Sequence, residues 1–294
     1  MYKSVAKAIA LIEFMAESEE PLRVSDLARK FGWPKSNVHQ MLNTLLKLGW
    51  VQKNERNSHY ELKLRIWQLG VGVQSRLRPN TVALPHMRTL ADATGETVHL
   101  SVFEKDHVVY VDQIESVHPV RAYSRIGGIG PVHCTATGKA MLAFQTSDII
   151  KANMRKLDAF TNKTITSSDE LLAVLAEVQV KGYASSHEEW RSGVSGVGAP
   201  IADNSSTVVA ALGISGPATR LTSKWCEEIG PLVRSLAQSA SQELGYSGSA
   251  FPPPSPMPLQ AENLKKATVN KAIQQATPKP AARSRRTRME AGLP

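Results

Sequence analysis

The sequence predicts an α+β fold divided between two domains and followed by a basic tail. Its 294 residues exceed the usual size of one domain. Helical and strand-like patterns alternate through most of the chain, and the sign of the charge changes along it. We expect a small N-terminal domain at residues 1–62, a linker helix at 63–79, a larger domain with a mainly antiparallel sheet at 80–246 and a disordered Pro-rich tail at 247–294.

Charge is distributed unevenly along the chain, whose net charge is +9. Residues 1–78 hold 13 basic and 7 acidic side chains, residues 79–246 hold 14 and 17, and residues 247–294 hold 8 and 2. The ends are therefore basic and the centre is slightly acidic. This distribution indicates that the ends meet a polyanion while the centre has another role.

The tail has two interpretations. Its prolines at 252–254 and its arginines between Arg283 and Arg288 leave too little apolar surface to stabilise a fold. It could add nonspecific contacts to phosphates, or it could be a solvated extension without a partner.

Three helices are expected at the N-terminus. The first has an apolar face formed by the side chains Val5, Ala8, Ile9, Ile12 and Met15. A short second helix is capped by Ser25 and stops at Gly32. The third runs from Lys35 to Lys47, begins after Pro34 and ends at Gly49. Its predicted buried stripe consists of Val38, Met41, Leu42, Leu45 and Leu46.

Two strands follow these helices. Residues 50–53 and 59–62 are rich in apolar and β-prone side chains, and the polar turn 54–58 joins them. Three helices followed by a hairpin are typical of a winged helix-turn-helix, in which the second helix of the pair enters the major groove of DNA. The alternative is a helical hairpin whose polar face is merely solvated.

The DNA-binding interpretation assigns roles to the outward-facing residues. The residues expected at base edges are Lys35, Ser36, Asn37, His39, Gln40, Asn43 and Thr44. Phosphate contacts are expected from Arg29 and Lys30, and from Lys53 and Arg56 in the wing. Asn37 and Gln40 can each pair with adenine through two hydrogen bonds.

The remaining segments alternate between the apolar spacing of helices and that of strands. A linker helix is expected from Leu64 to Arg76, although Gly70 and Gly72 weaken it. Further helices are expected up to Gly95 and at 138–144, 168–181 and 223–244. Strands are expected at 97–103, 108–114, 120–125, around 183, and at 194–201 and 208–214.

Several separated motifs resemble the IclR family of bacterial transcription regulators over residues 3–246. They include Trp33-Pro34-Lys35-Ser36, Gly95–Leu100, His133–Ala140, Gly182-Tyr183-Ala184, Ala199-Pro200-Ile201 and Leu212–Pro217. The resemblance implies a GAF-like domain that binds a small organic effector, and homodimers or homotetramers on palindromic double-stranded operator DNA. It also implies effector contacts from Ala136, Thr137, Gly196, Gly213 and Ser215, to which we add Ser186 as a sixth candidate.

Three positions depart from the family pattern. Ser186 stands where Asp is frequent, Gly196 where Cys is frequent, and Gly213 where Ser is frequent. Losing these polar side chains predicts a roomier pocket suited to a larger organic acid, aromatic or hydroxylated, rather than to a two- or three-carbon acid. In the third helix, Asn37 and Gln40 replace the common Thr and Arg, which predicts an atypical base preference.

A catalytic alternative rests on Cys134 beside His133. Adjacent residues on an extended segment point in opposite directions, so this thiol and imidazole are poorly placed as nucleophile and base, and a structural loop is the favoured interpretation. Cys226 is expected in the core. The competing function classes are a ligand-gated DNA-binding regulator and a cytosolic thiol or small-molecule enzyme with a vestigial helix-turn-helix.

Other chemistry has weaker support. The histidines lack metal-ligand spacing, and the glycines at 127–130 lack the context of a dinucleotide fingerprint, so neither a metal nor a cofactor is expected and the glycines are interpreted as a turn at the pocket. Glu188, Glu189 and Arg191 could pair with a cationic ligand, but a solvated face is favoured. No apolar stretch is long enough to cross a bilayer, so we expect a cytoplasmic protein.

Overall fold

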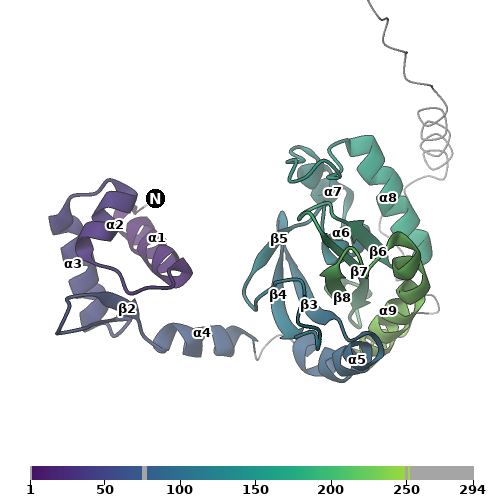
Figure 1. Ribbon diagram of the computed structural model, residues 1–294, viewed down its shortest axis with the longest axis horizontal. Helices are drawn as coiled ribbons and strands as arrows, with labels where there is room; N and C mark the ends of the chain where they lie inside the picture. Colours follow the sequence, from purple (N-terminus) through teal and green to yellow (C-terminus); the bar gives the residue numbers. More distant parts are fainter. Residues whose placement is uncertain (1, 75–77, 249–250, 252–294) are drawn as a thin grey trace, which may run out of the picture. The chain divides into compact units, whose positions relative to one another are not determined.

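The computed structural model describes residues 2–74, 78–248 and 251. Its internal contacts divide the chain into two units, one ending at Arg78 and one beginning at Pro79 (Figure 1). The tail predicted at 247–294 lies almost entirely outside the described residues. Each unit is considered by itself below.

The first unit has the predicted order of a winged helix-turn-helix. Its helices are α1 (Lys3–Glu17), α2 (Val24–Phe31), α3 (Lys35–Lys47) and α4 (Arg65–Gln74), and its antiparallel hairpin consists of β1 (Val51–Lys53) and β2 (Tyr60–Leu62). The backbone of Leu22 also pairs with that of Tyr60. The wing is therefore hydrogen-bonded to the segment that leads into α2.

The predicted packing of α1 and α3 is partly wrong. In α1, Leu11 and Met15 are buried, whereas Val5 and Ile9 are 57% and 51% exposed. Apolar residues occur on nearly every side of this helix, so periodicity alone could not select the face that packs. In α3, Val38, Leu42 and Leu45 are buried, but Leu46 is exposed.

The predicted cap of α2 is also wrong. Ser25 lies within the helix, which begins at Val24. The Asp26 carboxylate instead accepts a hydrogen bond from the backbone N–H of Arg23 at 3.0 Å. Gly32 ends the helix in the left-handed conformation, as expected for a C-terminal glycine.

The second unit is built on one antiparallel sheet. Its strands are β3 (Thr97–Glu104), β4 (His107–Ile114), β5 (Ile129–Pro131), β6 (Ala184–His187), β7 (Val194–Ala202) and β8 (Val208–Pro217). Their spatial order is β5-β4-β3-β8-β7-β6. The prediction of a mainly antiparallel sheet is confirmed, since every pair is antiparallel.

Helices cover both faces of this sheet (Figure 1). On one face, α5 (Arg78–Thr94) and α9 (Ser223–Glu243) share a core with alternate side chains of β3, β7 and β8. On the other, α6 (Ala136–Leu142), α7 (Ser147–Met154) and α8 (Ser168–Lys181) share a core with Val108 and Ala211. This arrangement places the beginning of α6 against the middle of the sheet.

One predicted strand in this unit is absent, one helix begins earlier than expected and one helix was missed. Residues 120–125 form no strand; they belong to an extended loop, and the edge strand β5 begins only at Ile129. The side chains of Val117 and Val120 are 80% and 69% exposed, so apolar character there reflects no packing. Helix α6 begins at Ala136 rather than Gly138, and α7 was not predicted. The glycines at 127–130 turn the chain into β5, with Gly127 at φ +79°.

Within residues 2–74 and 78–248, no helix combines the length and the apolarity needed to span a membrane.

Two leucines of α3 provide a matched test of its packing. Leu42 is fully buried, whereas Leu46 is 38% exposed. We predict that Leu42→Ala destabilises the first unit by about 2–5 kcal/mol and that Leu46→Ala has a much smaller effect. Denaturant unfolding followed by circular dichroism measures both, and equal losses would contradict the observed helix face.

Candidate DNA-binding surface and ligand pocket

The polar face of α3 is available to DNA. Lys35, Ser36, Asn37, His39 and Gln40 are exposed. Asn43 is half-buried, with its Nδ2 3.3 Å from Nδ1 of His39, and the Thr44 hydroxyl donates to the backbone carbonyl of Gln40 at 3.0 Å. The last two predicted DNA-contact residues therefore already have partners within the helix.

Aromatic packing joins α1, the end of α2 and the turn that leads into α3. The rings of Phe31 and Trp33 are stacked with centroids 4.4 Å apart, and Phe14 meets the edge of Phe31 at 5.6 Å. The ammonium groups of Lys7 and Lys30 lie 5.0 Å above the rings of Trp33 and Phe14. These contacts place Lys30 beside an aromatic ring, which weakens its assignment to phosphate.

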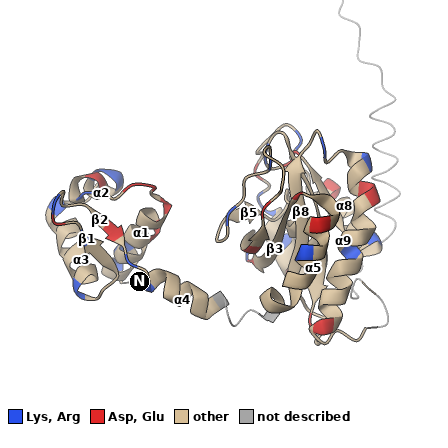
Figure 2. Ribbon diagram, turned by 60° about the horizontal axis from the view of Figure 1, so that its bottom comes forward, with Lys and Arg blue, Asp and Glu red and all other residues tan. Residues whose placement is uncertain are grey.

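The other predicted phosphate contacts lie at the surface of the same unit. Arg29 and Arg56 are exposed and Lys53 is half-buried. Figure 2 colours basic residues in α2 and near α3, and acidic residues in the segment after α1 and in β2. The exposed basic residues lie in α2 and in the wing, the elements that precede and follow α3 in the chain.

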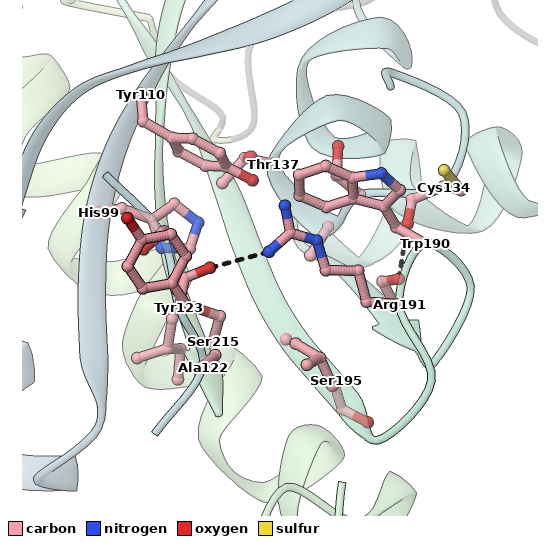
Figure 3. Close-up of a pocket in the computed structure, with 17 residues that line it drawn as sticks. His99, Tyr110, Ala122, Tyr123, Cys134, Thr137, Trp190, Arg191, Ser195 and Ser215 are labelled. Atoms are coloured by element: carbon pink, nitrogen blue, oxygen red, sulfur yellow. Dashed lines mark hydrogen bonds between the residues drawn. The ribbon is translucent and has the colours of Figure 1, made fainter. Parts of the chain in front are cut away.

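The second unit contains a pocket of about 60 Å³ between the sheet, the start of α6 and two loops (Figure 3). We call residues 115–128 the pocket loop and residues 187–191 the pocket wall. The lining residues are His99, Tyr110, Ala122, Tyr123, Ser124, Cys134, Thr135, Ala136, Thr137, Ser186, Trp190, Arg191, Val194, Ser195, Gly196, Ile214 and Ser215.

Five of the six residues that the sequence assigned to the effector line this pocket, namely Ala136, Thr137, Ser186, Gly196 and Ser215. Gly213 does not, because Thr137 covers it: a Cβ on Gly213 would lie 2.5 Å from Cγ2 of Thr137. Gly213 therefore lies behind the pocket lining and not in it.

The expectation that glycines enlarge the pocket is contradicted. A Cβ on Gly196 would lie 2.6 Å from the backbone oxygen of Ile214, and one on Gly198 would lie 2.9 Å from Cα of Thr137. These positions are already filled by neighbouring atoms. Gly198 lets α6 approach the sheet backbone closely, Gly196 lies against the backbone of β8, and neither glycine adds space for a ligand.

His99 and Tyr110 are polar lining residues that the sequence did not assign to the effector. His99 is 5% exposed, and its Nδ1 has no hydrogen-bond partner among the described residues. Burial lowers the pKa of His99 to about 4 and raises the pKa of Tyr110 to about 12, so both rings are uncharged at neutral pH. The two rings meet edge to face at 4.9 Å.

A sequence signal for His99 exists in retrospect. Thr97, His99 and Ser101 are polar residues at alternate positions of a strand, and all three are buried. Alternate residues share one face of a strand, so this run predicts a polar cavity on that face. The Ser101 hydroxyl donates to the Thr137 hydroxyl at 3.1 Å, which joins this row to α6.

Arg191 and Trp190 form one side of the pocket mouth. The guanidinium carbon of Arg191 lies 4.2 Å from the centroid of the Trp190 ring. Its Nη1 donates to the backbone carbonyl of Tyr123, in the pocket loop, at 3.0 Å (Figure 3). This arginine therefore bridges the two loops that bound the pocket.

The solvated-face interpretation of residues 188–191 is wrong for Glu189. Its carboxylate accepts hydrogen bonds from Nζ of Lys139 at 2.6 and 2.7 Å, and the two residues are 7% and 1% exposed. The Thr164 hydroxyl donates to the Glu189 carbonyl at 2.5 Å. Glu188 adopts φ +58°, a conformation that non-glycine residues adopt only under constraint. The pocket wall is thus held firmly to α6.

The thiols have no catalytic character. Cys134 is fully buried, and burial raises its pKa to about 12, so it is not ionised at neutral pH. The His133 ring lies 3.1 Å from the backbone carbonyl of Asp158. Cys226 is buried in the core, as expected. Among the described residues, no group of three potential metal ligands converges.

Comparisons with known proteins decide the family. The helix-turn-helix model of the IclR family matches residues 4–55, and the model of the IclR C-terminal domain matches residues 73–242. The chain belongs to the IclR family. Its order of domains therefore places the winged helix-turn-helix before a C-terminal ligand-binding domain.

Named relatives support the same family assignment. The transcriptional regulator KdgR of Escherichia coli is 31% identical over 84% of this chain and 95% of its own length. The transcriptional repressor IclR of E. coli is 32% identical over 84% and 90%. These names assign the IclR-family chain to DNA-binding transcription regulation and not to catalysis, as the sequence predicted.

Solved structures share the fold. The Thermotoga maritima IclR matches with a TM-score of 0.70 and 29% identity over 84% of this chain and 100% of its own. An IclR homologue from Microbacterium hydrocarbonoxydans, complexed with 4-hydroxybenzoate, matches with a TM-score of 0.73 and 23% identity over 83% and 99%.

The buried ion pair leads to a prediction about stability. Glu189→Leu leaves the Lys139 ammonium buried without a partner and should cost about 3–5 kcal/mol, whereas Lys139→Met combined with Glu189→Leu should recover much of this loss. Lys163→Ala, which removes an exposed partner of Glu188, is the control and should change little. Denaturant unfolding measures all three; a double variant as unstable as Glu189→Leu would refute the prediction.

The neutral His99 predicts a pH dependence. Because the folded-state pKa is lowered from 6.5 to about 4, the unfolded chain binds more protons between these values, and stability falls as pH falls from 6.5 towards 4. The contribution is on the order of 3 kcal/mol.

His99→Gln should flatten this dependence. Burial also lowers the pKa values of His133 and His187, but both residues are retained in the variant, so the difference between the two proteins isolates His99. Thermal unfolding of both proteins from pH 4 to 7 measures it, and parallel curves would count against the assignment.

Proposed function

We propose that this regulator binds a small organic acid in the pocket and that occupancy changes its affinity for operator DNA. The observation that carries the proposal is the character of the lining. Among the described lining residues, Arg191 is the only one with a full charge, and it lies with the aromatic rings of Tyr110, Tyr123 and Trp190. A positive charge beside aromatic surfaces favours an acid that carries a ring.

Uncharged polar groups complete the recognition. Ser124, Ser186, Ser195 and Ser215 line the pocket together with the neutral His99 ring. Few but well-placed polar groups among apolar surfaces are typical of sites that select one small molecule. The 4-hydroxybenzoate bound by the M. hydrocarbonoxydans homologue is consistent with such an effector, although that protein shares only the fold with this chain.

We propose that α3 lies in the major groove. In this arrangement the base edges meet Lys35, Ser36, Asn37, His39, Gln40, Asn43 and Thr44, while Arg29, Lys53 and Arg56 contact phosphates. The exposure of Asn37 and Gln40 supports this assignment. The exposed apolar side chains of Ile9 and Trp67 support assembly as a homodimer or homotetramer on a palindromic site.

Mobility shifts with the DNA that flanks its own gene test the function. We expect the protein to bind this DNA, and an effector acid should raise or lower the affinity about 5- to 150-fold. Thermal shifts with glyoxylate, pyruvate, benzoate and 4-hydroxybenzoate identify the class. Stabilisation by glyoxylate and pyruvate alone would refute the aromatic effector, and Cys134→Ala should leave the DNA response unchanged.

Base recognition by α3 has its own test. Gln40→Ala should relax the preference at one A·T position, at a cost of about 1–3 kcal/mol there. Lys53→Ala should instead weaken binding to all sequences and reduce its salt dependence. Selection of binding sites from random DNA measures both. Identical motifs for Gln40→Ala and the parent would show that Gln40 reads no base.

A further inference from the structure

We infer that Arg191 recognises the effector's carboxylate and that, by doing so, it releases the pocket loop that it holds across the pocket mouth. This inference rests on the proposed function, because it assumes an acidic effector in this pocket. It adds the residue that reads the acid and the segment that responds.

The pocket loop covers the pocket. Its ends are hydrogen-bonded to Gly95 and Tyr110, and its middle is attached by two arginines and by the Ser124 hydroxyl, which donates to Oε1 of Gln113 at 2.6 Å. Ala122, Tyr123 and Ser124 contribute to the lining. Arg191 donates to the Tyr123 carbonyl at 3.0 Å, and Nη2 of Arg220 donates to the Val120 carbonyl at 2.9 Å. Both bonds join the loop's backbone to side chains that lie outside it.

The two arginines are anchored differently. Arg220 also forms a two-pronged ion pair with the buried Glu96, with distances of 2.5 and 2.9 Å. A carboxylate thus fixes the Arg220 guanidinium. Arg191 has no carboxylate partner among the described residues; its guanidinium stacks on Trp190 and donates to a neutral carbonyl. Arg191 is therefore the attachment that an incoming anion can take over.

Little apolar packing holds the pocket loop in place, since Ala122 is the only buried apolar residue among its residues 115–128. The side chains of Val117, Val120, Tyr123 and Ile126 are 80%, 69%, 75% and 56% exposed. Moving the loop outwards therefore loses little buried apolar surface. The opposite side of the mouth is fixed, because Glu189 is paired with Lys139 and its carbonyl is held by Thr164. When the mouth opens, the pocket loop is the side that moves.

The small size of the pocket favours such a movement when a ring binds. Its volume is about 60 Å³, whereas a cavity that admits benzene measures about 150 Å³. A polar atom inside the pocket is also free to bind a ligand, since the buried Nδ1 of His99 has no partner in the described part of the chain. A ring that enters with its carboxylate on Arg191 gains this space when Tyr123 moves away.

The exchange of acceptors supplies the driving force. A carboxylate accepts two hydrogen bonds from a guanidinium and binds it more strongly than a neutral carbonyl does. The ligand thus interacts more favourably with the arrangement in which Arg191 has left Tyr123, which is the condition for a ligand to shift a conformational equilibrium. Figure 3 shows the guanidinium between the Trp190 ring and Tyr123, where this exchange takes place.

The attachment is tested without any effector by limited proteolysis. Chymotrypsin cleaves after Tyr123, and the cleavage rate reports how freely the loop leaves the pocket. We expect Arg191→Gln to raise this rate at least fivefold and Arg191→Lys to raise it less. Arg121→Gln is the matched control, because Arg121 pairs with Glu115 inside the same loop and should leave the rate unchanged. Equal rates for Arg191→Gln and the parent would overturn the attachment.

The recognition step is tested with benzoate and benzamide, which have the same ring but differ in charge. Calorimetric titration should show that Arg191→Gln weakens benzoate binding at least tenfold and leaves benzamide binding unchanged, with an intermediate loss for Arg191→Lys. Benzoate should also accelerate cleavage at Tyr123 in the parent protein. Arg121→Gln should match the parent in both assays.

The outcomes separate this inference from the proposed function. If benzoate binds the parent and Arg191→Gln equally well, Arg191 does not read the acid, while the pocket remains a ligand site. If none of the four acids of the thermal-shift panel binds the parent, the organic-acid function fails. In that case the ligand-free cleavage rates alone decide whether Arg191 holds the loop.

Discussion

The close approach of α6 to the backbone of β7 and β8 determines the arrangement of the second unit. Thr137 lies so near Gly198 and Gly213 that any side chain at these glycines would overlap it. Gly138 is equally constrained, since its Cβ would lie 2.3 Å from the Val132 carbonyl oxygen. This contact sets the floor of the pocket and directs the side chain of Lys139 away from it, into the interior. A chain without these glycines could not bring the same groups together.

The two sides of the pocket differ in how firmly they are held to α6 and the sheet. The wall at residues 187–191 is tied to α6 by the Lys139–Glu189 pair, which lies in a low-dielectric interior and cannot be broken cheaply. The pocket loop depends instead on hydrogen bonds at the surface. A stiff side facing a compliant one is a suitable arrangement for a sensor, because binding is converted into displacement of one defined segment.

The sequence predicted the local structure well where a proline or glycine marks the end of a helix. Pro34 and Gly49 bound α3 correctly, and family motifs placed Thr137 and Ser215 at the pocket. Contacts between distant residues could not be read in the same way. Lys139 and Glu189 are separated by 50 residues. No local pattern around either residue predicts that the two form an ion pair. The apolar residues of the pocket loop resembled a strand because composition alone does not distinguish buried apolar residues from exposed ones.

Burial of Cys134 has a consequence for the conditions under which such a sensor operates. Oxidants attack the thiolate, and a thiol with a pKa of about 12 is almost entirely protonated at neutral pH. Cys226 is shielded in the same way. These are the two cysteines of the sequence. Peroxide therefore finds no ready thiol target in this protein, so redox sensing through a cysteine is not to be expected of it.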